Sequence, residues 1–219
     1  MYSVDELEDR LIDLAFAEDI GDGDHTTFCC IPEEAMGKSH LLIKEDGILA
    51  GVEVAKRVFA RFDPTMKVEV LMGDGTPVKK GDIAMVVTGK VRSLLQTERL
   101  MLNIMQRMSG IATMTNRYVK RLEGTKTHVL DTRKTTPGMR MLEKQAVKIG
   151  GGMNHRIGLF DMILLKDNHV DFAGGIKNAI TRCHEYLKEK NLDLKIELEV
   201  RNFDELNQAL EQGGINRIM

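Results

Sequence analysis

The pattern of apolar and polar positions predicts a first half built from an amphipathic helix and short strands. Apolar residues recur at helical spacing after a capping-box pattern, Ser3 followed by Glu6, which predicts a helix over residues 4–17. Short apolar runs that end or begin at Gly-Asp turns predict a small, mostly antiparallel sheet. These runs are residues 41–43, 68–71 and 83–87. A helix over residues 52–62 is expected among these strands.

The middle of the chain predicts long helical structure. Residues 92–122 contain no proline, and Gly110 is the only glycine there. We expect one or two long helices over this segment, with a break near Ser109 and Gly110.

The second half alternates between strands and helices, which is the pattern of βα units and a parallel sheet. Short apolar runs predict strands at residues 129–130, 162–165 and 194–200, with a fourth beginning at 217–219. Helices are expected over 137–149, over 174–190, and from Asn202 to Gly213, with Thr136 and Pro137 at the start of the first. A closed α/β barrel takes about eight strands, and this pattern yields four. Either the sheet is open, or the chain stops short of a complete barrel.

Charged side chains follow the predicted parallel strands, where open α/β sheets and α/β barrels both place their active sites. Arg133 and Lys134 follow the first strand, Lys166 follows the second, and Glu199 ends the third. With Arg156, these cations lie at junctions between elements. Cations that converge repel one another unless an anion binds among them, and arginine matches carboxylates or phosphates in two-pronged fashion. The pattern predicts a small, compact ligand with at least two negative charges.

The local charge balance strengthens this prediction, because the chain as a whole is not basic. Residues 131–169 hold seven cations and four acids, whereas the whole chain has a formal net charge of −2. That value argues against a general nucleic-acid binder or a polybasic membrane binder. Lys144 and Lys148, four apart on a predicted helix, are expected to lie on a solvated face.

Other candidate groups leave alternatives open. His155 and His169 are better explained as hydrogen-bonding side chains than as metal ligands. Residues 150–152, three glycines, suit either a phosphate-cradling loop or a simple helix end. We expect Cys29 and Cys30 to be a buried or half-buried thiol pair.

The composition also predicts where the protein works. Three cysteines in 219 residues indicate a reducing compartment rather than a disulfide framework. The first residues are acidic where a signal peptide is basic, and no apolar run approaches the roughly 18 residues that span a bilayer. We expect a soluble, cytoplasmic protein.

Several stretches of the chain carry a family resemblance when they are taken together. Three of them are Asp131-Thr132-Arg133-Lys134-Thr135, Gly150-Gly151-Gly152 with Asn154-His155-Arg156, and Lys166-Asp167-Asn168-His169. Further stretches are Glu18-Asp19-Ile20-Gly21, Glu98-Arg99, Ser109-Gly110-Ile111-Ala112-Thr113 and Glu197-Leu198-Glu199-Val200. Together they resemble the quinolinate phosphoribosyltransferase family, the decarboxylating nicotinate-nucleotide pyrophosphorylases of NAD biosynthesis. They occur in family order along nearly the whole chain, and the combination of the first three is highly specific.

The resemblance implies an N-terminal α/β sandwich domain, residues 1–110, and a TIM-like α/β barrel domain, residues 111–219, that is incomplete at its C-terminal end. It implies transfer of a 5-phosphoribosyl group from phosphoribosyl pyrophosphate to quinolinate with decarboxylation. It also implies a homodimer, or a higher even oligomer, whose sites are shared between subunits, and Mg²⁺ accompanying phosphoribosyl pyrophosphate near Glu199.

The resemblance also assigns roles to residues. Catalysis would fall to Lys134, Lys166 and Glu199, with no residue binding the metal directly. The substrate-binding set would be Arg99, donated by the partner subunit, together with Thr132, Arg133, Lys134, His155, Arg156, Lys166 and Glu199.

One departure bears on activity. The family has an acidic strand-end motif and glycine-rich phosphate loops beyond the position of Met219, so truncation of the sequence is expected. Two alternatives are a family relative that acts on another small anionic heterocycle without decarboxylation, and an inactive anion-binding remnant.

Overall fold

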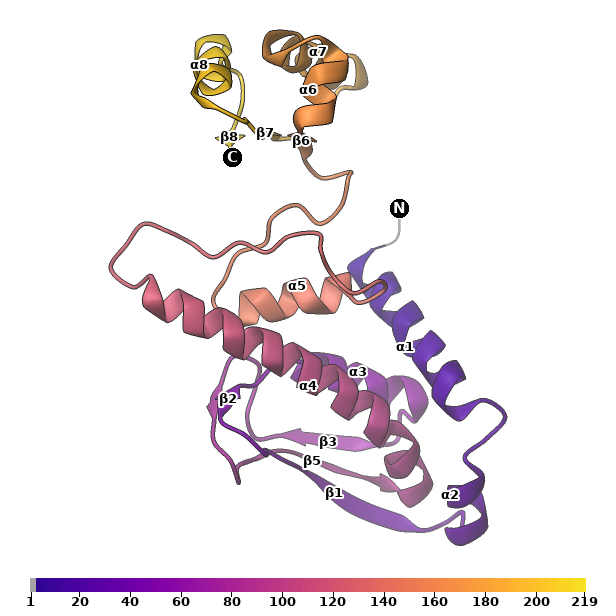
Figure 1. Cartoon of the computed structure of the whole chain (residues 1–219). Coiled ribbons are helices and arrows are strands. Elements are labelled where there is room, and N and C mark those ends of the chain that lie inside the picture. Colours follow the sequence, from indigo (N-terminus) through magenta and orange to yellow (C-terminus); the bar gives the residue numbers. More distant parts are fainter. Residues whose placement is uncertain (1–2) are drawn as a thin grey trace. The chain divides into compact units, whose positions relative to one another are not determined.

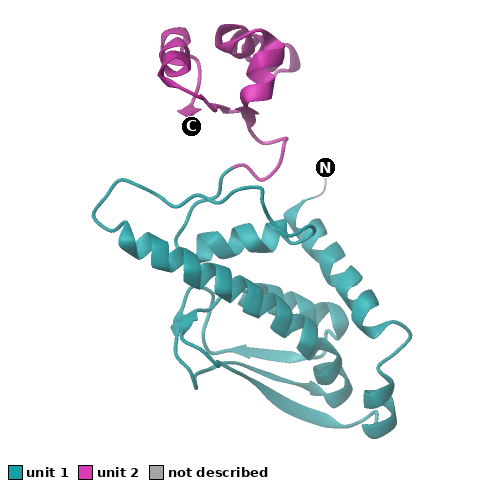
Figure 2. Cartoon of the chain, viewed as in Figure 1, with its two compact units in different colours: residues 1–155 teal, residues 156–219 magenta. Residues whose placement is uncertain are grey.

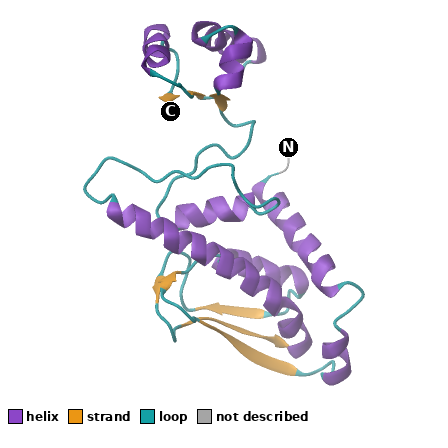
Figure 3. Cartoon of the chain, viewed as in Figure 1, coloured by secondary structure: helices purple, strands orange, loops and turns teal. Residues whose placement is uncertain are grey.

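The computed structural model describes residues 3–219, which divide into two compact units at the boundary between residues 155 and 156 (Figure 2). The chain is a mixed α/β structure, with helices throughout and short strands in both units (Figure 3). The two units are described separately.

The first unit combines five helices with two small antiparallel sheets in its described residues (Figure 1). The helices are α1 (Val4–Ile20), α2 (His25–Cys30), α3 (Val52–Phe62), α4 (Val91–Arg121) and α5 (Arg140–Ile149). The strands are β1 (Met36–Leu42), β2 (Gly47–Ile48), β3 (Lys67–Val70), β4 (Pro77–Val78) and β5 (Ile83–Lys90). The larger sheet has the order β1-β5-β3, and β2 pairs with β4. The predicted antiparallel sheet and the helix over 52–62 are therefore confirmed.

Helices α3 and α4 pack with the central strand β5 into the core of this unit (Figure 1). Four consecutive residues of β5, 84–87, are buried, and β5 lies between β1 and β3 in the sheet. Helix α4 contributes buried Met101, Met105 and Met108 from one stripe of its surface. Methionine suits this position because its unbranched side chain fills irregular gaps, in a chain that has no tryptophan.

Helix α4 is continuous, so the predicted break near Ser109 and Gly110 is wrong. The buried stripe runs on past Gly110 to Ala112, and the Ser109 hydroxyl accepts from Ala50 N at 3.0 Å and donates to Ala50 O at 3.1 Å. A single glycine costs a helix only about 1 kcal/mol, which packing along both neighbouring turns offsets.

The segment before α5 differs from the prediction in two ways. Thr136 and Pro137 lie in a turn, and α5 begins three residues later, at Arg140, because Thr136 is bound to Glu143 rather than capping the helix. Residues 129–130 do not form a full strand. Leu130 instead makes an isolated parallel bridge with Met153.

The glycines after α5 serve close packing against α4. Gly150 is the C-cap of α5, and a Cβ atom there would overlap the carbonyl oxygen of Ala112. A Cβ atom on Gly152 would lie 2.8 Å from both Thr115 and Val147. Of the two explanations left open by the sequence, the structure supports the end of a helix, packed closely against its neighbour.

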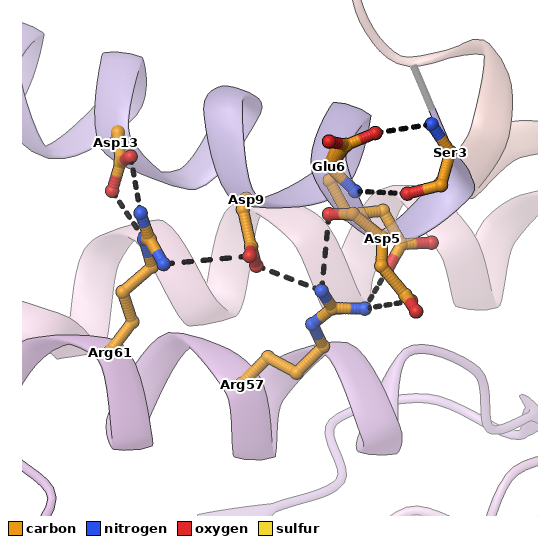
Figure 4. A network of polar contacts seen from close by, with 8 residues as sticks. Ser3, Asp5, Glu6, Asp9, Asp13, Arg57 and Arg61 are labelled. Atoms are coloured by element: carbon orange, nitrogen blue, oxygen red, sulfur yellow. Dashed lines mark hydrogen bonds and ion pairs between the residues drawn. The ribbon is translucent and has the colours of Figure 1, made fainter. Parts of the chain in front are cut away.

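Helix α1 is joined to α3 by a ladder of ion pairs (Figure 4). Its N-terminus has the predicted capping box, in which Ser3 N donates to Glu6 at 2.6 Å and Glu6 N donates to the Ser3 hydroxyl at 3.1 Å. Arg57 and Arg61 of α3 then bind four carboxylates of α1: Asp5, Glu8, Asp9 and Asp13. These ion pairs are called the α1–α3 ladder.

The second unit contains three parallel strands in the order β6-β7-β8, as the alternation of strands and helices predicts. The strands are β6 (Ile163–Leu165), β7 (Ile196–Leu198) and β8 (Arg217–Ile218). The helices are α6 (Asp167–Ala173), α7 (Ile176–Lys190) and α8 (Phe203–Gln212). Two glycines at positive φ, Gly174 and Gly175, separate α6 from α7, and Asn202 caps α8 as expected. Apolar residues of the strands, including Leu165 and Leu198, pack against these helices.

No helix in the described part of the chain is both long and apolar enough to cross a membrane. Cys29 and Cys30 are exposed, not buried, because α2 is a short helix with only Thr27 buried, and their sulfur atoms lie 3.4 Å apart.

Candidate anion-binding site

Two segments of the first unit that carry predicted site residues run side by side. Met153 N donates to Val129 O at 2.9 Å, and Asp131 N donates to Met153 O at 3.2 Å, which makes the two segments parallel neighbours. Residues 132–134 and His155 follow these bonds along their respective segments. The structure therefore places the Arg133-Lys134 segment next to the segment that leads to His155.

Asp131 ties the two segments together through its carboxylate. Its Oδ1 accepts from the backbone N of His155 at 2.8 Å, and its Oδ2 accepts from Asn154 Nδ2 at 2.6 Å. Lys144 of α5 forms an ion pair with the same carboxylate, and its Nζ also donates to His155 O at 3.3 Å. The lysine side chain is 3% exposed and that of Asp131 is 8% exposed, so this is a buried pair.

Lys144 is therefore not on a solvated face, and that prediction is wrong. Helical spacing alone suggests a surface pair, and indeed Lys148 is exposed. Lys144 turns instead toward Asp131, the acid that precedes the Arg133-Lys134 segment. The available sequence signal for this partner was Asp131 itself. It is an acid that precedes a cationic segment and has no basic neighbour of its own on a predicted helix face.

The other end of the loop is held by Glu143, the neighbour of Lys144 on α5. Its Oε1 accepts from Arg107 of α4 at 2.7 and 3.0 Å, and its Oε2 accepts from Thr136 N at 3.2 Å. Arg107 also donates to the Thr136 hydroxyl at 3.0 Å. Burial alone would raise the pKa of Glu143, but these hydrogen bonds outweigh it and hold the pKa below its ordinary value. Pattern reading of the sequence missed Arg107 and Glu143.

The residues between the two anchors are the ones that the sequence assigned to a ligand. Thr132 and Lys134 are exposed, and Lys134 N donates to the Thr132 hydroxyl at 3.1 Å. Arg133 is half-buried, and its Nε atom is buried without a hydrogen-bond partner among the described residues. An unsatisfied buried donor is costly, so this atom fits a site whose acceptor comes from a ligand.

The second unit brings Lys166 and Glu199 together at one edge of its sheet. Leu165 pairs with Leu198 in the parallel register, and Glu199 N donates to Leu165 O at 2.9 Å. Lys166 and Glu199 are the residues that directly follow β6 and β7, at the carboxyl ends of these strands.

Other charged residues of this unit have protein partners. Arg156 is buried and donates to Met162 O at 3.2 Å, and Glu197 is buried and pairs with Arg217 at 3.1 Å. Arg201 binds Asp171 at 2.8 and 3.0 Å and also binds Glu205. Hydrogen bonds that Arg201 donates to Glu205 and Asp171 raise its pKa, so its charge is already compensated within the chain.

Arg99 stands apart from the other candidates in the first unit. It is exposed on α4, and the structure describes no hydrogen bond or ion pair from its side chain to any residue between 3 and 219.

A cleft of about 540 Å³ also lies along α4, between the helix and the segment 41–49. Its lining is mostly apolar and contains none of the predicted site residues, so it is not the predicted anion site.

His169 has an ordinary structural role, as expected. Its Nδ1 accepts from Lys166 N at 3.0 Å across the start of α6. Over residues 3–219, no three side chains of histidine, cysteine, aspartate or glutamate gather as they would around a metal ion.

Fold and site define a two-part α/β protein with two adjacent cations, Arg133 and Lys134, on an anchored loop of the first unit. Its second unit carries a lysine and a glutamate, Lys166 and Glu199, at the carboxyl end of a parallel sheet. The family models for quinolinate phosphoribosyl transferase match it at both parts, the N-terminal domain over residues 24–109 and the C-terminal domain over residues 111–219. The chain belongs to the quinolinate phosphoribosyl transferase family.

Individual relatives agree with this assignment. The chain is 47% identical over 202 residues to the chloroplastic nicotinate-nucleotide pyrophosphorylase [carboxylating] of Arabidopsis thaliana, covering 92% of this chain and 58% of that protein. It is 45% identical to quinolinate phosphoribosyltransferase [decarboxylating] 1b of Nicotiana tabacum, covering 92% of this chain and 57% of that protein. The chain thus spans somewhat more than half the length of these relatives.

A solved structure gives the same result for the fold. The crystal structure of NadC from Streptococcus pyogenes matches with a TM-score of 0.91 at 38% identity, covering 100% of this chain and 76% of that chain. The family models meet at residues 109–111, whereas the division into compact units falls at residue 155.

Proposed function

We propose that this protein transfers the 5-phosphoribosyl group of phosphoribosyl pyrophosphate to quinolinate, giving nicotinate mononucleotide, CO₂ and pyrophosphate. The observation that carries the proposal is the anchored loop in which Arg133 and Lys134 lie between the buried Lys144–Asp131 pair and the partly exposed Arg107–Glu143 pair. Within this loop the Nε of Arg133 is buried without a hydrogen-bond partner among the described residues. Two carboxylates on one small ring are a suitable ligand for such paired donors.

We assign the substrate-binding residues as the family pattern places them. The carboxylates of quinolinate are assigned to Arg133, Lys134, His155, Arg156 and Lys166, with Thr132 beside them and Arg99 supplied by a second subunit. The exposed position of Arg99, without a polar partner among residues 3–219, supports a role toward another subunit. A homodimer or a higher even oligomer follows from this assignment.

The chemistry divides into transfer and decarboxylation. Anchoring both carboxylates directs the ring nitrogen at C1 of the ribose, and positioning of this kind can lower a barrier by about 7–11 kcal/mol. The ring nitrogen forms the new bond to C1 as the C1–oxygen bond to pyrophosphate breaks, and Glu199 stabilises the positive charge on the ribose. Mg²⁺ commonly binds substrate phosphates with one or two carboxylates, and Glu199 would be the carboxylate near it.

Decarboxylation follows because the alkylated ring is a pyridinium. The bond from ring carbon 2 to its carboxylate breaks, CO₂ leaves, and the electron pair remains beside the positive nitrogen. Lys134 or Lys166 then gives that carbon a proton. Exclusion of water favours this step, since a free carboxylate is better solvated than the developing carbanion.

Two wider features belong to the same proposal. We propose that the parallel strands of the second unit are part of a TIM-like α/β barrel, incomplete within residues 111–219, that follows a sandwich domain over residues 1–110. The cytoplasmic location expected from the reduced cysteines is likewise a proposal, since the names of plant relatives specify chloroplasts or mitochondria.

The first test is quinolinate binding and turnover after Arg133→Ala. Loss of one charge-assisted contact should weaken quinolinate affinity by about 1.5–3 kcal/mol, or roughly 10- to 150-fold. Calorimetric titration with quinolinate, and detection of nicotinate mononucleotide, measure the two quantities. Lys148→Ala, an exposed charge removed from α5, is the matched control. Unchanged quinolinate affinity in Arg133→Ala would contradict the site assignment, and turnover of nicotinate in place of quinolinate would point to a different substrate.

The second test concerns the shared site. Arg99→Ala mixed with Glu199→Gln should regain activity that neither variant has alone, because one hybrid site then carries both native residues. Assays of mixed and separately folded variants measure this, and the absence of any recovery would exclude a borrowed Arg99.

A further inference from the structure

Two adjacent residues of α5 carry buried charges. Glu143 is 7% exposed and Lys144 is 3% exposed, on a helix whose other buried positions are Leu142 and Ala146. Charged side chains are rarely buried unless they are paired, because leaving water is unfavourable for an ion. Both residues are paired: Lys144 with Asp131, which precedes Arg133 and Lys134, and Glu143 with Arg107 of α4. Glu143 also accepts from Thr136 N, which follows these two cations in the same loop.

Lys144 contacts both segments of the first unit that carry predicted site residues. Its Nζ binds the carboxylate of Asp131 and the carbonyl oxygen of His155, at 3.3 Å for the latter. Asp131 in turn holds the backbone N of His155 at 2.8 Å and Asn154 Nδ2 at 2.6 Å, while Asn154 Nδ2 also donates to Lys144 O at 2.8 Å. A single ammonium group thus fixes the spacing between the Arg133-Lys134 segment and His155.

The far end of the loop is fixed from the same helix. Glu143 accepts from Thr136 N and from Arg107, and Arg140 Nε donates to the Thr135 hydroxyl at 3.1 Å. The loop residues 132–134 therefore leave one anchor and return to the other over a short span. Cations held in this way are placed before a ligand arrives, which reduces the ordering cost of binding.

We infer that Lys144 is a positioning residue for the diacid, acting through Asp131 on Arg133, Lys134 and His155 without contacting the ligand itself. Its ammonium group is buried and already bound to Asp131 and His155, so it is not available to a substrate. This inference rests on the proposed function for the identity of the ligand, quinolinate.

The test compares Lys144→Met with Lys148→Met, two charge removals four residues apart on the same helix, one buried and one exposed. Lys144→Met should weaken quinolinate binding by about tenfold or more, the effect of losing about 1.4 kcal/mol of preorganised contact. Phosphoribosyl pyrophosphate binding should not change measurably in either variant, and Lys148→Met should bind quinolinate as the unaltered protein does. A purely structural role would weaken both ligands together.

A second variant is needed because Lys144→Met leaves Asp131 charged and buried and could weaken binding simply by unfolding the protein. Asp131→Asn combined with Lys144→Met removes both charges and should recover much of the unfolding midpoint. Quinolinate binding should remain weak in this double variant, because a single amide oxygen replaces the two carboxylate oxygens that hold Asn154 and His155. Recovery of quinolinate affinity along with stability would overturn the inference, as would normal quinolinate affinity in Lys144→Met.

Hydrogen exchange separates this inference from the proposed function. Amides of residues 131–136 and 153–155 should exchange faster in Lys144→Met than in Lys148→Met, whatever the ligand is. If the unaltered protein does not bind quinolinate, the proposed function fails and the diacid role of Lys144 fails with it. If the protein binds quinolinate and these amides exchange equally in both variants, the function stands and the positioning role is wrong.

Discussion

The α1–α3 ladder differs in its surroundings from the α5 anchors, the Lys144–Asp131 and Arg107–Glu143 pairs of the first unit. In the ladder, Arg57 is 31% exposed, and one of its partners, Asp5, is 80% exposed (Figure 4). At the α5 anchor, Lys144 and Asp131 are 3% and 8% exposed. Exposed pairs are worth little, commonly below about 1 kcal/mol, whereas loss of one partner from a buried pair costs about 3–5 kcal/mol.

The networks also differ in how many carboxylates share one cation. The pKa values of their glutamates, Glu8 and Glu143, are shifted in opposite directions. Arg57 serves three acids, Asp5, Glu8 and Asp9, so no one of them has the whole charge. Burial raises the pKa of Glu8 despite the nearby guanidinium, and the two aspartates raise it further. The pKa of Arg57 is itself raised by hydrogen bonds to Asp5 and Asp9, which outweigh its partial burial. In Glu143, by contrast, the hydrogen bonds prevail over burial and lower the pKa.

This comparison indicates different uses for similar residues. The ladder joins one helix to another and tolerates excess acid because water still reaches most of its members. The α5 anchors hold a loop in place, and each pairs one buried carboxylate with one cation, because little water reaches the two acids. Predictions that separate the two networks follow, in order of effect.

The largest effect on stability is expected from Lys144→Met. Removing the ammonium leaves the Asp131 carboxylate buried and unpaired, and the free energy of unfolding should fall by about 3–5 kcal/mol. Urea denaturation measures it, with Lys148→Met expected to stay within about 0.5 kcal/mol of the unaltered protein. A loss for Lys144→Met as small as that for Lys148→Met would mean that the anchor resembles the exposed ladder.

An intermediate effect that depends on pH is expected from Glu143→Gln. The folded-state pKa of Glu143 lies below its ordinary value of 4.5, so its ionised form stabilises the fold above that pH. This stabilisation is lost as the pH falls through the lowered pKa. Because Arg107 is half exposed, we expect a loss of about 1–2 kcal/mol at pH 7 that disappears in acid. Denaturation at pH 7 and below pH 4.5 should be compared with that of Glu53→Gln, an exposed pair on α3, and a loss independent of pH would contradict this prediction.

The smallest effect, with the opposite dependence on pH, is expected from Glu8→Gln. The folded-state pKa of Glu8 lies above 4.5, so the fold favours the protonated form, and stability falls as the pH rises from 4.5 through the raised pKa. The free energy of unfolding of Glu8→Gln should therefore rise relative to that of the unaltered protein between pH 4.5 and 7, by about 1 kcal/mol or less. Glu18→Gln, exposed on the same helix, is the control. A benefit that shrinks as pH rises would show that Arg57 dominates Glu8 after all.

Much of the fold could be predicted from the sequence because it depends on local periodicity. The helix at Val52–Phe62, the capping box at Ser3 and the parallel strands of the second unit all follow from neighbours a few residues apart. Errors arose where a distant contact decided the outcome. Packing on both sides carried α4 through Gly110, and a bond from Thr136 to Glu143 delayed the start of α5.

For the site, the sequence by itself determined which cations are candidates and that they fall at the ends of predicted strands, because residue type and strand pattern can be read from neighbouring positions. It determined Arg133, Lys134, Lys166 and Glu199 as candidates. Only the tertiary structure decided that Lys144 is buried against Asp131 and that Arg107 reaches Glu143 from another helix. Burial and ion pairing depend on which segments meet in space, and a charge on a helix face reads the same in sequence whether water or a carboxylate lies opposite it.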